Sequence, residues 1–103
     1  MQTGALPYWE AAVTRFPDNG RLRFGYANAL WQDDQNHAAL RAYRATVERT
    51  PDLAPAWNNL AYALRDSGHP EQAREAVCHA RQLAPEDDNV ADSVAEITDG
   101  RGC

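Results

Sequence analysis

Apolar residues recur along the chain in stripes that have the spacing of α-helices. Residues 54–66 carry one such stripe, at positions i, i+3, i+4 and i+7: Trp57, Leu60, Ala61 and Leu64. A second, narrower stripe precedes Pro85: Ala73, Val77 and Ala80. Side chains at these spacings share one face of a helix. The pattern therefore predicts two short helices joined by a turn within residues 54–87, with Trp57 in the core.

The same two stripes occur 34 residues earlier: Tyr26, Ala27 and Leu30, then Ala39, Tyr43 and Thr46. The second stripe alone occurs once more: Ala5, Trp9 and Ala12. Prolines follow the second stripes at the same interval of 34 residues: Pro17, Pro51 and Pro85. Proline ends a helix because its ring clashes with the preceding turn. A fixed period of this size is typical of a repeated structural unit, and we expect Trp9 in its core.

The segments between the stripes contain residues suited to tight turns. Gly68 and Pro70 separate the two predicted helices of residues 54–87, and glycine suits a helix end as proline suits a helix start. The segment 32–36 holds the same place upstream, and its Asp34 belongs to a residue type that tolerates the left-handed conformation. Both segments predict a turn between antiparallel helices.

Both ends of the chain depart from the full repeat. Pro7 interrupts the first stripe, so its helix is expected to begin there and to end at Phe16. After Pro85, one segment carries an apolar and an acidic stripe: Val90, Val94 and Ile97 against Asp92, Glu96 and Asp99. We interpret this segment as a capping helix whose acidic side faces water, as terminal repeats require. Acidic residues 86–88 suit its N-terminus through the helix dipole.

Together these patterns predict one all-α domain over residues 1–103. It consists of a half-repeat at 5–17, full repeats at 20–53 and 54–87, a capping helix at 88–98 and a loose tail at 99–103. Stacked helix pairs of this kind form a curved solenoid, in which we expect the first helix of each pair to line the concave side.

These residues resemble the tetratricopeptide repeat family. Its 34-residue pattern is Trp-x2-Leu-Gly-x2-Tyr, then Ala-x3-Phe, then Pro. The corresponding positions are Trp57, Leu60, Ala61, Leu64, Ala73, Val77, Ala80 and Pro85, with Ala61, Leu64 and Val77 as mild departures. The upstream repeat has Arg23 in place of the tryptophan, with Phe24 beside it. The resemblance covers residues 5–98 and implies an α–α superhelix that binds a protein or peptide partner.

Composition narrows the choice of partner. The formal net charge is −5 and no lysine is present, which disfavours nucleic acid and anionic membrane surfaces because both select clustered cations. No apolar run approaches the length of a membrane-spanning helix. The start, Met1-Gln2-Thr3-Gly4, lacks the basic and apolar regions of a signal peptide. We expect no nucleic acid partner and no membrane insertion, and the compartment stays open, with the cytoplasm as default.

The face of each first helix that is not used for packing is the candidate binding surface. It carries aromatic, amide and arginine side chains: Arg21, Phe24, Asn28, Trp31, Asn58, Asn59, Tyr62 and Arg65. An amide donates and accepts hydrogen bonds together, so asparagine can hold an extended peptide backbone. Trp and Arg are the residue types that dominate interface energetics. These residues predict a peptide-binding groove.

Three of these positions have competing interpretations. Some family members hold a partner's terminal carboxylate with two asparagines and three basic residues, and the resemblance places Asn28 and Asn59 at the asparagine positions. The basic positions hold Phe24, Asn89 and Ser93, which argues against that clamp. The asparagines could instead bond neighbouring helices, and Trp31 could be half-buried against its neighbour rather than face a ligand.

Catalytic chemistry finds little support. The three histidines lie on predicted turns or an outer helix, without zinc-ligand spacing: His37, His69 and His79. Cys78 and His79 are adjacent, so a helix would point them about 100° apart, and they form no nucleophile–base pair. We expect Cys78 to be a small apolar filler or a half-exposed thiol. No catalytic, cofactor or metal site is predicted.

Three functions are compatible with these residues. The first is a protein–protein interaction module that holds its partner in the concave groove. The second is an accessory module of a larger enzyme, since residues 54–61 and 9–12 resemble the C-terminal repeat segment of bacterial proteins with a cysteine-peptidase-like domain. The third is a weak homodimer, formed through the face around Tyr8 and Trp9 that a truncated first repeat leaves uncovered.

Overall fold

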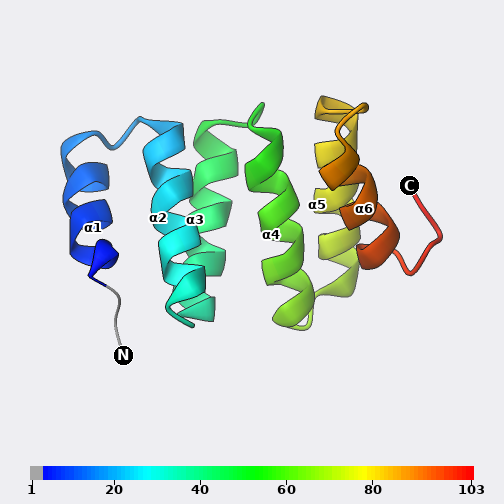
Figure 1. Ribbon diagram of the computed structural model, residues 1–103, viewed down its shortest axis with the longest axis horizontal. Coiled ribbons are helices and arrows are strands. Elements are labelled where there is room, and N and C mark those ends of the chain that lie inside the picture. Colours follow the sequence, from blue (N-terminus) through cyan, green and yellow to red (C-terminus); the bar gives the residue numbers. More distant parts are fainter. Residues whose placement is uncertain (1–3) are drawn as a thin grey trace. The chain divides into compact units, whose positions relative to one another are not determined.

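The computed structural model describes residues 4–103, and this part of the chain contains six α-helices and no strand (Figure 1). The helices are α1 (Ala5–Arg15), α2 (Gly20–Gln32), α3 (Asn36–Arg49), α4 (Ala54–Asp66), α5 (Pro70–Leu83) and α6 (Asp88–Ile97). Residues 1–3 lie outside the described residues. The expectation that the chain does not start with a signal peptide falls mostly on them. The expected helix pairs are therefore present.

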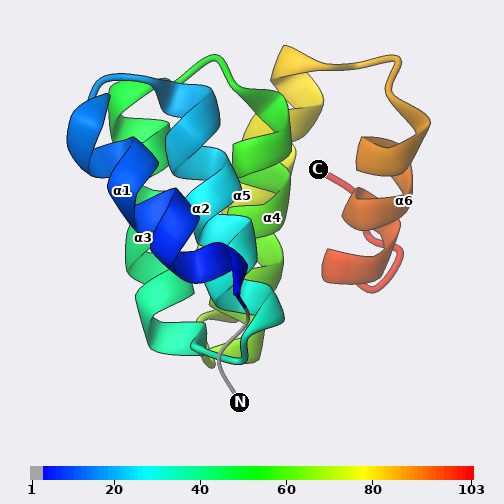
Figure 2. The same cartoon turned by 60° about the vertical axis from the view of Figure 1, so that its left-hand side comes forward.

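The helices form two compact units, residues 1–51 and 52–103. In the first unit, α2 packs against both α1 and α3. In the second unit, α5 packs against both α4 and α6, and α6 also touches α4. Within each unit, consecutive helices run in opposite directions (Figures 1 and 2). In each unit the middle helix thus packs against the helix before it and the helix after it.

Alanine at equivalent positions lets the paired helices approach closely. Ala27 and Ala39 in the first unit, and Ala61 and Ala73 in the second, are fully buried. A methyl side chain leaves room for a neighbouring backbone, and larger residues fill the space beside it. The buried Tyr43, with 2% of its surface exposed, is the largest of these residues. The predicted stripes of α3 and α5 are buried, as are the alanines and leucines of the stripes of α2 and α4. In α1 the buried residue is Leu6, whereas Ala5 of the predicted stripe is exposed.

The two tryptophans expected in the core are instead half-buried. The Trp57 ring lies against the ring of His79, with 4.2 Å between their centroids. Trp9 covers Gly25 of α2, where a Cβ atom would lie 2.4 Å from the indole. An indole is too large to fit wholly between helices that alanine holds close, so one edge of each ring stays at the surface.

Both interhelical turns contain the left-handed residue that the sequence indicates. Asp34 has φ 60° and Gly68, 34 residues later, has φ 84°. In each turn a backbone amide donates a hydrogen bond to a carbonyl group in the last turn of the preceding helix. Gln35 N donates to Leu30 O at 3.0 Å, and His69 N donates to Leu64 O at 2.8 Å. These bonds satisfy carbonyl groups that a helix end leaves unpaired.

Helix α1 begins earlier than the sequence predicts, and α6 begins with the acidic residues that it predicts. Helix α1 begins at Ala5, before Pro7, because proline is tolerated in the first turn, where its missing amide hydrogen has no partner to lose. Asp87 caps α6, and its carboxylate accepts hydrogen bonds from Asn89 N and Val90 N. The acidic start of the last helix is confirmed as a stabilising cap.

The C-terminal residues correct the expectation of a loose tail and of a free Cys78. Cys78 of α5 forms a disulfide with Cys103, with a Cα–Cα distance of 5.7 Å. The Thr98 hydroxyl accepts a hydrogen bond from Gly102 N at 2.9 Å. The chain turns back after α6 through Asp99 and Gly100, both with positive φ. This reversal brings the last residue to α5, and no local sequence pattern indicates it.

Gly25→Ala should lower the free energy of unfolding by about 1–3 kcal/mol, because the added methyl group would overlap the Trp9 ring. Urea denaturation monitored by circular dichroism measures it. In a Trp9→Leu background the clash is removed, and the same change should be neutral or favourable since alanine is the better helix former. A gain in stability in the unmodified background would contradict the packing described for Trp9.

Gly68→Ala should lower the free energy of unfolding by about 1 kcal/mol, because a Cβ atom is unfavourable in the left-handed region. Gly68→Asp should cost less, since aspartate already occupies that conformation at the equivalent residue 34. Thermal and urea unfolding of both variants measure the difference. Equal losses for alanine and aspartate would show that the conformation of this turn is not what limits the choice of residue.

Candidate functional site

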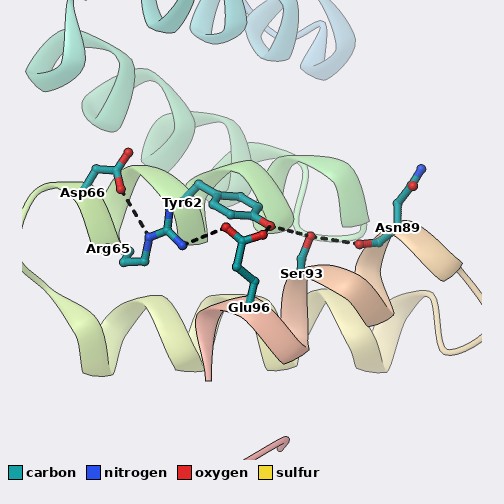
Figure 3. A network of polar contacts seen from close by, with 6 residues as sticks. All are labelled: Tyr62, Arg65, Asp66, Asn89, Ser93 and Glu96. Carbon is teal, nitrogen blue, oxygen red and sulfur yellow. Dashed lines mark hydrogen bonds and ion pairs between the residues drawn. The ribbon is translucent and has the colours of Figure 1, made fainter. Parts of the chain in front are cut away.

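The α4 face that carries Tyr62 and Arg65 is joined to α6 by a polar network. Arg65 Nη1 donates to Glu96 Oε2 at 3.0 Å, and the Tyr62 hydroxyl lies 3.2 Å from Glu96 Oε1. Both oxygens of one carboxylate therefore have a donor from the same helix. Figure 3 shows these side chains meeting between the two helices. The arrangement is a two-donor cradle for a carboxylate.

Ser93 extends the network along α6. The Tyr62 hydroxyl lies 3.2 Å from Ser93 Oγ, which itself donates to the carbonyl oxygen of Asn89 at 2.9 Å (Figure 3). Because the serine proton points to that carbonyl, Ser93 Oγ is an acceptor for Tyr62. A phenol has one proton, so Tyr62 divides it between Ser93 and Glu96.

Arg65 is held in place by three contacts. Besides Glu96, its Nε lies 3.3 Å from Asp66 Oδ1, and its guanidinium carbon lies 5.0 Å from the centre of the Tyr62 ring. The hydrogen bond with Glu96 is the largest cause of a raised pKa of Arg65, with Asp66 acting in the same direction. The side chains remain 38% exposed for Arg65 and 58% for Glu96, so solvent screens this ion pair.

Two of the candidate residues on α2, Phe24 and Asn28, contact α3 within the first unit. The Tyr43 hydroxyl donates a hydrogen bond to Asn28 Oδ1, and the Phe24 and Tyr43 rings lie 6.3 Å apart. Trp31 is half-buried and Arg21 is exposed. Asn28 thus forms a hydrogen bond with a neighbouring helix, which agrees with the interpretation that these asparagines join helices.

The two adjacent asparagines of α4 are both half-buried. Asn58 Oδ1 is shielded from solvent and accepts no hydrogen bond in the described part of the chain. A buried acceptor without a donor costs about 1–3 kcal/mol. The candidate residues therefore lie on two faces: one on α2 in the first unit, and one on α4 in the second, where Tyr62 and Arg65 meet.

The sequence does not indicate that Ser93 and Glu96 of α6 contact Tyr62 of the α4 face. It singles out Ser93 only as an uncharged residue at a clamp position. The sequence predicts Glu96 on the solvent side of the capping helix, and the residue is exposed, yet its carboxylate reaches Arg65. The signal was present in the period, since Glu96 stands 34 residues after Tyr62. Equivalent positions of successive first helices are neighbours in this unit.

A recess of about 590 Å³ is lined by residues of α5 and by the C-terminal residues. Its lining includes the disulfide and side chains of both charges: Glu71, Arg74, Asp99 and Arg101. Since the charges are mixed, the recess favours no one class of ligand. Across residues 4–103, no three side chains of the metal-binding types gather into a site, and no described helix has the length and hydropathy to cross a bilayer.

A chain of helix pairs with a 34-residue period and a left-handed residue between the helices of each pair is a helical-repeat protein. Two sequence models of the tetratricopeptide repeat match it, over residues 3–54 and 42–75. The chain belongs to the tetratricopeptide repeat family. The expected all-α repeat class is confirmed.

One solved structure similar to this chain is that of YrrB, described as a TPR protein with an unusual peptide-binding site. The TM-score is 0.79 at 25% sequence identity, over 86% of this chain and 46% of YrrB. The chain thus spans about half the length of that protein. A comparison with curated protein sequences found no match.

A double-mutant cycle on Arg65→Gln and Glu96→Gln should give a coupling energy of about 0.2–1 kcal/mol, because both side chains are partly exposed. Urea denaturation of the two single variants and the double variant measures it. The coupling should fall at about 1 M salt, where screening is strong. The pair Arg49–Asp18, with 50% and 93% of the side chains exposed, is the matched control and should couple more weakly. Coupling that is absent at low salt would contradict the ion pair.

Proposed function

We propose that the chain is a protein–protein interaction module that holds a peptide or partner surface on the faces of its first helices. The residues involved would be those predicted from the sequence: Arg21, Phe24, Asn28, Trp31, Asn58, Asn59, Tyr62 and Arg65. Membership of the tetratricopeptide repeat family and the similarity to YrrB support this proposal. Repeats of this family generally act as interaction modules, so we expect no catalytic activity.

The observation that carries the proposal is the contact between α4 and α6. Tyr62 and Arg65 hold a carboxylate and a hydroxyl group of another helix, which is the kind of contact an interaction surface makes with a partner. The acceptor of Asn58, buried without a donor, adds a group that a ligand amide could satisfy after a small rearrangement.

The alternatives receive less support. Trp9 packs on Gly25, so a homodimer through the first helix would rest on Tyr8, which is 67% exposed. The role as a module of an enzyme with a cysteine-peptidase-like domain stays a prediction, as does the absence of a nucleic acid partner.

Peptide phage display on the immobilised chain, followed by calorimetric titration of the selected peptides, tests the proposal. Asn59→Ala and Trp31→Ala should each weaken binding at least tenfold, which corresponds to about 1.4 kcal/mol. Arg41→Ala changes an exposed residue of a second helix, α3, and should leave binding unchanged. Selected peptides that bind all three variants as well as the unmodified chain would place the site elsewhere.

A further inference from the structure

Helix α6 occupies the α4 face in the manner of a bound ligand. It has ten residues, too few for a stable helix in isolation, and it is ordered by its contacts. Val90 and Val94 are buried at 3% and 4% exposure, while Ser93 and Glu96 make the polar contacts to Tyr62. An amphipathic helix with an acidic edge is thus the occupant that this face accepts.

The chemistry of the face favours a carboxylate. Arg65 and Tyr62 donate to the two oxygens of Glu96, and a charged donor paired with a carboxylate makes a stronger hydrogen bond than a neutral pair. The Tyr62 ring and Asp66 hold the guanidinium in position. A partner helix with Glu at the same place, beside two apolar residues, would satisfy the same donors.

A covalent link holds the end of α6 in place. The helix ends at Ile97, and six residues later Cys103 is bonded to Cys78 of α5. Thr98 is buried and accepts from Gly102 N, so the segment between helix and disulfide has a defined path. Cys103 is exposed, so a thiol reductant can approach the disulfide from this end.

We propose that α6 is an internal occupant of a carboxylate-binding subsite formed by Tyr62 and Arg65, retained there by the Cys78–Cys103 disulfide and replaced, after reduction, by an acidic amphipathic helix of a partner. This inference rests on the proposed function. It adds the class of ligand, an acidic amphipathic helix, and the means of regulation, reduction of the disulfide. The reductant is a dithiol: it gives two electrons and two protons, the Sγ–Sγ bond breaks to two thiols, and the dithiol becomes a disulfide.

Release follows from the position of α6 in the chain. It is the last helix, and terminal elements open at the lowest free energy unless they are tied down. The disulfide ties one end, while the other end continues from α5 through four residues, 84–87. With the bond broken, α6 is held by its valines and by exposed polar contacts, and a partner helix can compete for the subsite.

Hydrogen exchange on the full chain tests the release. Amides of α6 from residue 92 to residue 97, which have partners within the helix, should exchange at least tenfold faster with dithiothreitol than without it. Amides of α5 from residue 74 to residue 80 should change less than twofold. Cys103→Ser without reductant should reproduce the effect. Unchanged α6 exchange would overturn the proposal, and so would an equal acceleration in α5, because the disulfide would then support the whole unit.

A labelled peptide with the sequence of residues 86–98 tests the subsite by fluorescence anisotropy. In the Cys103→Ser/Glu96→Ala chain the internal carboxylate is absent, and the peptide should bind at least tenfold more tightly than to the oxidised unmodified chain. A peptide with Glu96→Gln should bind at least fivefold more weakly, and so should the chain with Arg65→Gln added. Arg41→Gln is the matched control for loss of an arginine.

Equal binding of the Glu and Gln peptides would overturn the carboxylate subsite. Equal binding of the first peptide to the oxidised chain and to the double variant would overturn the control by the disulfide. Either result would leave the proposed function standing if Asn59→Ala still weakened the peptides selected by display. The failure of the inference is therefore distinguishable from the failure of the proposed function.

Discussion

Close approach of paired helices at buried alanines is the contact on which the rest of the structure depends. Ala27 and Ala39 in one unit, and Ala61 and Ala73 in the other, expose no surface. A larger side chain there would separate the backbones, and an interior packed to crystal-like density has little room to absorb it. The separation of the helices determines which residues beside the apolar stripe reach a neighbouring helix. The packing of the repeat thus also positions its candidate binding residues.

The 34-residue period extends from the core to the polar face. Tyr62 and Glu96 are equivalent positions of successive first helices, and they touch because α4 and α6 are neighbours. The last helix has glutamate at the position that tyrosine occupies in α4. The Glu96 carboxylate therefore also reaches Arg65, which lies about one turn after Tyr62 in α4. Helix α6 therefore completes the apolar packing of the second unit and also covers the Tyr62 and Arg65 face of α4. The same helix caps the repeat and occupies this face.

The regular part of this fold was predictable from sequence because local chemistry determines it. Stripes at helical spacing, helix-ending prolines and the left-handed turn residues Asp34 and Gly68 each act within a few residues. The disulfide was not predictable, since Cys78 and Cys103 lie 25 residues apart and only the reversal after α6 brings them together. The burial of Trp9 depends on Gly25 of another helix, and the role of Glu96 on the approach of α6. Such contacts between elements have no local signature.

The disulfide acts on the folding of α6 as well as on its position. Ten residues do not form a stable helix alone in water, so α6 exists as a helix because it is docked. A covalent bond that closes a loop of this size restricts the undocked chain, and on a chain-entropy account it favours docking by about 3–4 kcal/mol. Docking, helix formation and occupancy of the Arg65 cradle are therefore coupled. A change at Cys103, which is bonded to α5, therefore reaches that cradle through the order of a single helix.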